Sequence, residues 1–97
     1  MSDDWGFAPP PFKPDAALLQ LRRSLRELGL AERGDGCELH GKRVIEWSLD
    51  DAAIRARLAR QPALTPQWDA WPLKSAADQR KLVDEVKKRL ERWQRED

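Results

Sequence analysis

The sequence predicts an α+β domain in which a helix, three antiparallel strands and a second helix follow one another, in the order αβββα. Apolar residues recur at three- and four-residue steps in two segments near the ends of the chain, which indicates amphipathic helices. Between these segments apolar and polar residues alternate, as in half-buried strands. Because the strands have one apolar face, both helices should cover that face of the sheet.

Residues 1–14 are predicted to form an extended leader. Proline is incompatible with the interior of a helix and favours polyproline II, and the segment contains Pro9, Pro10, Pro11 and Pro14. The PPPFKP sequence can act as a ligand for an aromatic groove. Alternatively, Trp5, Phe7 and Phe12 pack back onto the domain. Residues 15–97 then form a single domain with one modest core.

The first helix is expected to begin near Asp15, a good N-cap residue, and to end at Gly29. Leucines spaced three or four residues apart form its apolar stripe: Leu18, Leu21, Leu25 and Leu28. Its other face carries Arg22, Arg23 and Arg26.

The segment CELHGKRVIEWSL, residues 37–49, is predicted to form a hairpin with one buried face. A three-residue loop would place Leu39 opposite Ile45 and Cys37 opposite Trp47. A two-residue loop at Gly41 and Lys42 would scatter the apolar residues over both faces, so we favour the longer loop. The outer face would then carry Glu38, His40, Val44, Glu46, Arg55 and Arg57.

Residues 53–59 are compatible with either a helix or a strand. Ser48 and Asp51 resemble a capping box, and the residues that follow are good helix formers. As a strand, however, the segment would place Ile54, Ala56 and Leu58 on one face. Since an isolated hairpin is only marginally stable, a third strand would stabilise it, and we predict a strand.

Two tryptophans, Trp68 and Trp71, lie in a proline-containing segment that we interpret as a crossover loop, QPALTPQWDAWPLKS at residues 61–75. Large apolar side chains are unusual in a loop. They either cover the open end of a small core or contact a partner, and the sequence leaves both alternatives open.

The C-terminal helix is predicted from a capping box formed by Ser75 and Asp78, which precedes a long amphipathic run. Its stripe consists of Leu82, Val83, Val86, Leu90 and Trp93. Oppositely charged residues four apart should stabilise its exposed side: Asp84 with Lys88, Glu85 with Arg89, and Glu91 with Arg95.

Composition limits the function classes. The 18 Lys and Arg residues nearly balance 17 Asp and Glu residues, so the net charge of +1 gives no general attraction to nucleic acid or to anionic membranes. No apolar run approaches the roughly 20 residues that span a bilayer, and the acidic N-terminus is unlike a signal peptide. The single Cys37 excludes an internal disulfide. These features predict a cytoplasmic location.

The sequence gives little sign of catalysis. Cys37 and His40 would point to opposite faces of a strand and cannot form a dyad. As metal ligands they number only two, and the chain has no further Cys or His. No glycine-rich phosphate-binding loop occurs. We therefore predict a protein that is not an enzyme and has no cofactor or metal.

The function that remains is a small binding module, with another protein as the expected partner and a monomeric or weakly dimeric state. The candidate binding residues are Trp68 and Trp71, followed by the basic residues Arg22, Arg26, Lys87 and Lys88. The alternative is nucleic-acid binding, because the αβββα order resembles that of double-stranded-RNA-binding domains. That family has a lysine cluster at the start of its second helix, whereas the equivalent segment here is SAADQRKL.

Nearly the whole chain resembles small uncharacterised bacterial proteins of similar length. The segments that carry the resemblance are FKPDAALLQLRRSLRELGL, ELHGKRVIEWSL, ARLARQPALTPQWD and LKSAADQRKLVDEVKKRLERW. The resemblance implies a strand over residues 53–59. It implies no activity, so no functional residues can be transferred.

Overall fold

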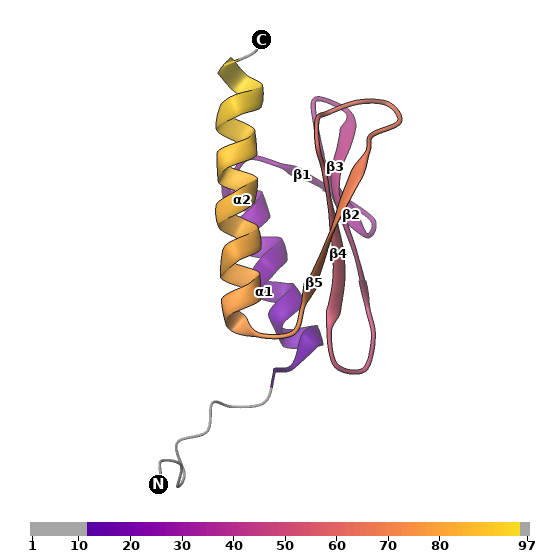
Figure 1. Ribbon diagram of the computed structural model, residues 1–97, viewed down its shortest axis with the longest axis vertical. Coiled ribbons are helices and arrows are strands. Elements are labelled where there is room, and N and C mark those ends of the chain that lie inside the picture. The colour runs from indigo at the N-terminus through magenta and orange to yellow at the C-terminus, as the bar shows by residue number, and fades with distance from the viewer. Residues whose placement is uncertain (1–11, 96–97) are drawn as a thin grey trace, which may run out of the picture.

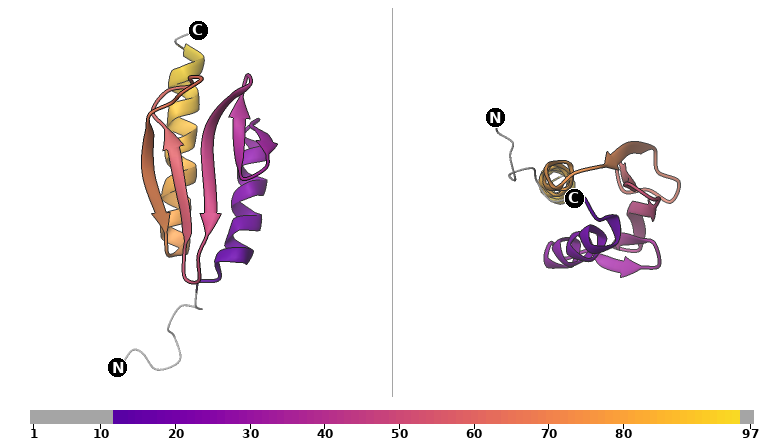
Figure 2. Two further views of the ribbon diagram at one scale, coloured as in Figure 1. Left: turned by 90° about the vertical axis from the view of Figure 1, so that its right-hand side faces the viewer. Right: turned by 90° about the horizontal axis from the view of Figure 1, so that it is seen from below.

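The computed structural model describes residues 12–95, which form two helices packed on one face of an antiparallel sheet (Figures 1 and 2). The sheet has five strands in the order β1-β2-β3-β4-β5, so each strand pairs with its neighbour in sequence. The elements are α1 (Pro14–Glu27), β1 (Ala31–Arg33), β2 (Gly36–Leu39), β3 (Lys42–Leu49), β4 (Ile54–Ala59), β5 (Trp68–Leu73) and α2 (Ala76–Arg95). The α+β class is confirmed, but the predicted three-stranded αβββα fold is wrong.

The sheet contains two strands that the sequence analysis did not predict. β1 has only three residues and is too short to show an alternating pattern. β5 occupies the segment that we interpreted as a crossover loop, because its prolines suggested irregular structure. Pro72 pairs with Arg55 in this edge strand. An edge strand accepts proline where the missing N–H would point away from the neighbouring strand.

The hairpin of β2 and β3 has a shorter loop than predicted. His40 and Gly41 form a two-residue turn, both with positive φ (53° and 80°), as hairpins of this length prefer. A bulge then inserts Val44 into β3, which pairs Cys37 with Ile45. The bulge keeps the apolar residues on one face, which is the effect that we expected from a longer loop. Val44 is therefore buried, and its predicted place on the outer face is wrong.

The strand predicted over residues 53–59 is confirmed. β4 pairs in register with β3, with Ala56 opposite Trp47 and Ile54 opposite Leu49. The preceding turn is stabilised by Asp50, whose carboxylate accepts hydrogen bonds from the N–H groups of Ala52 and Ala53. These bonds form a turn instead of a helix N-terminus.

Both predicted helices are present, with small changes at their ends. α1 begins at Pro14, one residue before the expected cap, and Lys13 occupies the N-cap position. It ends at Glu27 with Leu28 as its C-cap, followed by Gly29, whose φ of 93° suits glycine, and the N–H of Leu30 bonds to the carbonyl of Leu25.

α2 has the predicted cap, because the Ser75 hydroxyl accepts a hydrogen bond from the N–H of Asp78 at 3.1 Å. The Asp78 carboxylate in turn accepts one from the N–H of Lys74. Of the three predicted ion pairs on this helix, Glu85 with Arg89 forms within the described residues.

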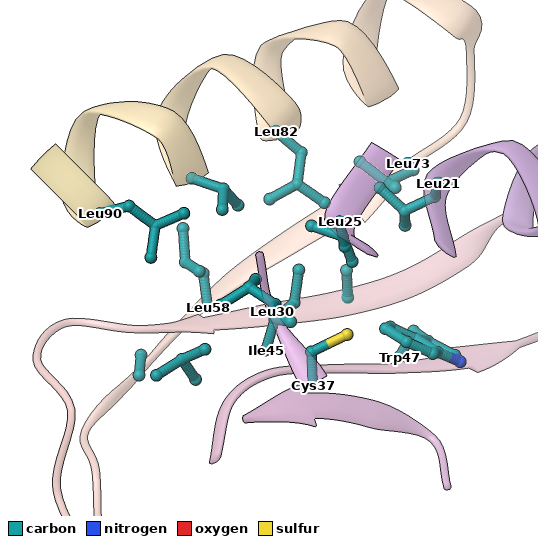
Figure 3. Close-up of a cluster of buried hydrophobic side chains, with 14 of the residues drawn as sticks. Leu21, Leu25, Leu30, Cys37, Ile45, Trp47, Leu58, Leu73, Leu82 and Leu90 are labelled. Carbon is teal, nitrogen blue, oxygen red and sulfur yellow. The ribbon is translucent and has the colours of Figure 1, made fainter. Parts of the chain in front are cut away.

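The core lies between the helix layer and the sheet. Leu21 and Leu25 of α1 and Leu82 of α2 are fully buried against Ile45 and other apolar side chains of the strands (Figure 3). α1 packs on β1, α2 packs on β5, and the helices contact each other. The other face of the sheet has no helix over it (Figure 2).

Most of the predicted leader lies outside the described residues, which begin at Phe12. Phe12 is half-buried and packs against the core. This agrees with the alternative in which the aromatic residues of the leader pack back onto the domain. Of the described helices, neither is long and apolar enough to cross a membrane.

Candidate functional site: the uncovered face of the sheet

The face of the sheet that the helices leave uncovered is lined mainly by charged side chains. Residues of β3, β4 and β5 alternate between the two faces, and the paired positions Glu46, Arg57 and Ala70 lie in one row on the uncovered side. Ser48, Arg55 and Pro72 form the next row. All of these residues except Pro72 border a shallow depression of ≈ 370 Å³.

Glu46 is the centre of an ion-pair network on this face. Its carboxylate accepts hydrogen bonds from the Nε atoms of Arg43, at 2.5 Å, and Arg57, at 2.7 Å. Arg43 also donates to the backbone carbonyl of Arg33 in β1. Partial burial acts to raise the pKa of Glu46, but the hydrogen bonds and positive charges of Arg57 and Arg43 outweigh it and hold the pKa below its usual value.

The arginines of this face are more exposed than the carboxylates that they contact. Glu38 and Glu46 have side chains that are 25% and 24% exposed. Arg33 and Arg55 are each 73% exposed, and Arg57 is 51% exposed. The outermost layer of the face therefore consists mostly of guanidinium groups.

Trp68 lies beside this network. It follows the same strand alternation as Ala70 and Pro72, and the guanidinium carbon of Arg57 is 4.5 Å from the centre of its ring. This geometry is a cation–π contact. Trp68 remains half-buried, so part of its ring is accessible from the uncovered side.

Trp71, three residues further on, faces the helices. It pairs with Ala56, whose other neighbour is the buried Trp47, and it packs against the core. The two candidate tryptophans are thus not brought together. Both pack against the core and are half-buried, Trp71 from the helix-facing side of the sheet and Trp68 from the uncovered side.

The basic candidates from the sequence lie on the helices. Arg22 donates to Glu32 of β1 at 2.7 Å, and Arg26 lies 3.8 Å from the same carboxylate. These two arginines tie α1 to the edge of the sheet. Lys87 and Lys88 are exposed on α2. The structure therefore does not bring the four basic residues and the tryptophans into one surface.

Cys37 and His40 are separated as well. Cys37 is fully buried beneath α1, whereas His40 is exposed in the β2–β3 turn. Burial, and then the nearby charge of Glu32, raise the pKa of the Cys37 thiol to about 11, so it is not a nucleophile at neutral pH. Among residues 12–95, no group of three or more His, Cys, Asp and Glu side chains could hold a metal ion.

Arg57, Arg43 and Glu46 are not among the site residues predicted from the sequence. Arg57 and Glu46 were placed correctly on the outer face, but nothing in the sequence indicated that they would contact each other and Trp68. That contact depends on β5, which was not predicted. Knowing that Trp68 lies on a strand next to β4 would have shown that it is a diagonal neighbour of Arg57.

No protein-family model, curated protein or solved structure matches this chain, which is consistent with its resemblance to proteins without an assigned function. The function is therefore inferred from the surface alone.

Proposed function

We propose that this domain binds another protein through the uncovered face of its sheet, without catalysis. The observation that carries the proposal is the accessible ring of Trp68, held against the Arg57 guanidinium on the only large face of the described structure that no helix covers. Tryptophan and arginine are the residues most often found at energetic centres of protein interfaces. Their mutual contact fixes both side chains before a partner arrives, which lowers the entropic cost of binding.

The charges of this face favour a protein segment that carries carboxylates next to an apolar side chain. The exposed guanidinium groups of Arg33, Arg55 and Arg57 can pair with carboxylates, while Trp68 offers apolar contact area.

The sheet has five strands, so the chain does not have the αβββα order on which the prediction of nucleic-acid binding depended. The experiment below also tests whether the partner is a nucleic acid.

The proposal can be tested by affinity capture from the organism that makes the protein. The wild-type chain and the variants Trp68→Ala and Arg57→Gln serve as baits, and the retained proteins are identified and quantified by mass spectrometry. We expect the same protein to be retained by the wild type and reduced about tenfold by each variant, the size expected for an interface centre.

Arg23→Gln is the matched control, because it removes one exposed arginine from the helix layer. It should retain the partner as the wild type does. Equal retention by all four baits would contradict the proposed surface. Retention that depends on Trp68 and Arg57 but disappears after nuclease treatment would show that the partner is a nucleic acid.

A further inference from the structure

A second cavity lies at another place, between the β4–β5 loop and the C-terminal half of α2. The loop and this half of the helix are at the same end of the molecule (Figures 1 and 2). The cavity has a volume of ≈ 580 Å³, which is within the range of small-molecule sites. Its lining includes Arg60, Arg89, Arg92 and Asp69, together with uncharged polar residues of the loop.

Arg89 is held rigidly in the wall of this cavity. Its Nε donates to Glu85 at 2.8 Å, one terminal nitrogen donates to the carbonyl of Ala59 at 2.9 Å, and the other lies 3.0 Å from Asp69. Its side chain is only 12% exposed. Because three different elements supply these acceptors, the guanidinium group has a fixed position.

Asp69 is fully engaged by two arginines. One carboxylate oxygen accepts a hydrogen bond from Arg60 at 2.9 Å, and the other faces Arg89. The hydrogen bond from Arg60 is the main reason that the pKa of Asp69 lies below its usual value. Three guanidinium groups therefore line the cavity, and the carboxylates of Asp69 and Glu85 balance two of their charges, which leaves one positive charge in excess.

These guanidinium groups also have N–H donors to spare. A guanidinium group carries five N–H donors, and Arg89 uses three of them within the described residues. The hydroxyl of Thr65 and the amide of Gln61 supply further donors in the same lining.

We infer that this cavity binds the phosphate group of a phosphate monoester. A monoester carries about −1.5 to −2 charges at pH 7, opposite in sign to the excess positive charge at the lining. A guanidinium group can donate two parallel hydrogen bonds to phosphate oxygens, and these bonds are stronger than those from neutral donors. The volume exceeds that of a phosphate group, so the cavity can also accommodate part of the attached molecule. This inference does not depend on the proposed sheet-face function, because it involves a different cavity.

The first test is a titration of the isotopically labelled protein with inorganic phosphate, followed by NMR at constant ionic strength. Saturable shifts are expected for the amides of residues 61–67 and for the Nε–H groups of the lining arginines. Arg92→Gln should weaken binding about tenfold, because it removes a charge-assisted hydrogen bond to the phosphate. Arg92 is exposed, so this variant should melt as the wild type does.

Arg80→Gln is the matched control, because Arg80 is an exposed arginine of the same helix outside this lining. It should bind phosphate like the wild type. Shifts that do not saturate, an equal loss in both variants, or equal affinity for acetate would each overturn the inference.

The source of the phosphate is then identified by two probes, ribose 5-phosphate and a short phosphoserine peptide. We expect one of the two probes to bind more tightly than inorganic phosphate. Tighter binding of ribose 5-phosphate would indicate a small-molecule ligand, and tighter binding of the phosphoserine peptide would indicate a phosphorylated protein. If neither binds more tightly, the rest of the cavity contributes nothing, and a monoester site is ruled out.

Discussion

At the scale of single residues, Trp68 and Trp71 show how spacing determines role. Three residues apart on a helix, they would share a face, but on β5 they point to opposite sides of the sheet. Trp71 adds apolar area to the core. Trp68 also packs against the core, but it lies on the uncovered side of the sheet and contacts Arg57, so we expect its removal to affect stability less than the removal of Trp71.

Alanine substitutions of the two tryptophans should therefore differ in their effect on stability. Trp71→Ala removes a half-buried ring from the helix-facing side and should lower the free energy of unfolding by about 2–4 kcal/mol. Trp68→Ala should lower it by about 1 kcal/mol, from the lost cation–π contact and partial burial. Urea denaturation followed by circular dichroism measures both values. A larger loss for Trp68→Ala would contradict the assignment of the two faces.

Cys37 should be unreactive in the native state, because it is fully buried and burial raises its pKa to about 11. A thiol reagent should modify it only at the rate at which the protein unfolds.

The same shift predicts a dependence of stability on alkaline pH. An unfolded cysteine ionises near its ordinary value of 9.0, whereas the folded one stays neutral to about 11. Stability from the buried thiol is therefore complete below pH 9 and is lost as the pH rises to 11. Since one pKa unit equals about 1.4 kcal/mol, this loss should reach about 2–3 kcal/mol. Cys37→Ala should lack it, and parallel pH profiles for the two proteins would contradict the prediction.

At the scale of elements, polar contacts on the uncovered face reinforce the pairing of the strands. The network around Glu46 links β3 to β4 through Arg57, and Arg43 extends it to the backbone of β1. β1 is an edge strand of only three residues, and the hydrogen bond from Arg43 helps to hold it in the sheet. Gly36, its neighbour in β2, lies so close to the Ile45 carbonyl oxygen that a Cβ atom there would clash with it.

Glu46→Gln should destabilise the sheet at neutral pH by about 0.5–1 kcal/mol, the range for partly exposed ion pairs. The pKa of Glu46 is held below its ordinary value of 4.5, so its contribution is complete above that value. It is lost as the pH falls through the lower pKa of the folded state. The stability of wild type and variant should therefore converge in acid. Thermal melts between pH 7 and pH 3 test this, and a difference that persists at pH 3 would contradict it.

The sequence predicted the elements with strong periodicity and missed those that depend on tertiary contacts. The leucine stripe of α1, the Ser75 cap of α2 and the alternation in β4 were sufficient to identify these elements. β5 contains Asp69 on the helix-facing side and Pro72 at the edge, and both disguise a strand until Arg60 and Arg89 are known to neutralise the carboxylate. The bulge at Val44 likewise becomes apparent only when the pairing of β3 with β2 is known.

The candidate site was only partly predictable for the same reason. The sequence selected Trp68, but it also selected Arg22 and Arg26, which bind Glu32 at the edge of the sheet. Clusters of basic residues on a helix do not reveal whether carboxylates from another element will neutralise them.

At the scale of the whole molecule, a two-layer arrangement gives the strands unequal protection. β2, β3 and β4 have a strand on each side, whereas β1 and β5 are the edges of the sheet. α2 packs on β5 and α1 on β1, so the helices support both edges from one side only.

Hydrogen exchange should reflect this inequality. The amides of Ile45, Trp47 and Leu58 should exchange only through global unfolding, because they lie in the central strands with buried side chains. Amides of β1 should exchange faster through local opening. NMR exchange rates in native conditions measure the difference, and equal protection of β1 and β3 would show that the domain opens as one unit.

The order of the strands also affects how the chain folds during its synthesis. Since each strand pairs with the next one in sequence, all four hairpins can form soon after their residues leave the ribosome. α2 is made after the sheet, yet it supplies Leu82, Val86, Leu90 and Trp93 to the core. Until those residues emerge, the sheet has only α1 to cover its apolar face. An interval with an exposed apolar surface favours aggregation, and the nascent chain is most exposed to that hazard just before the residues of α2 are available.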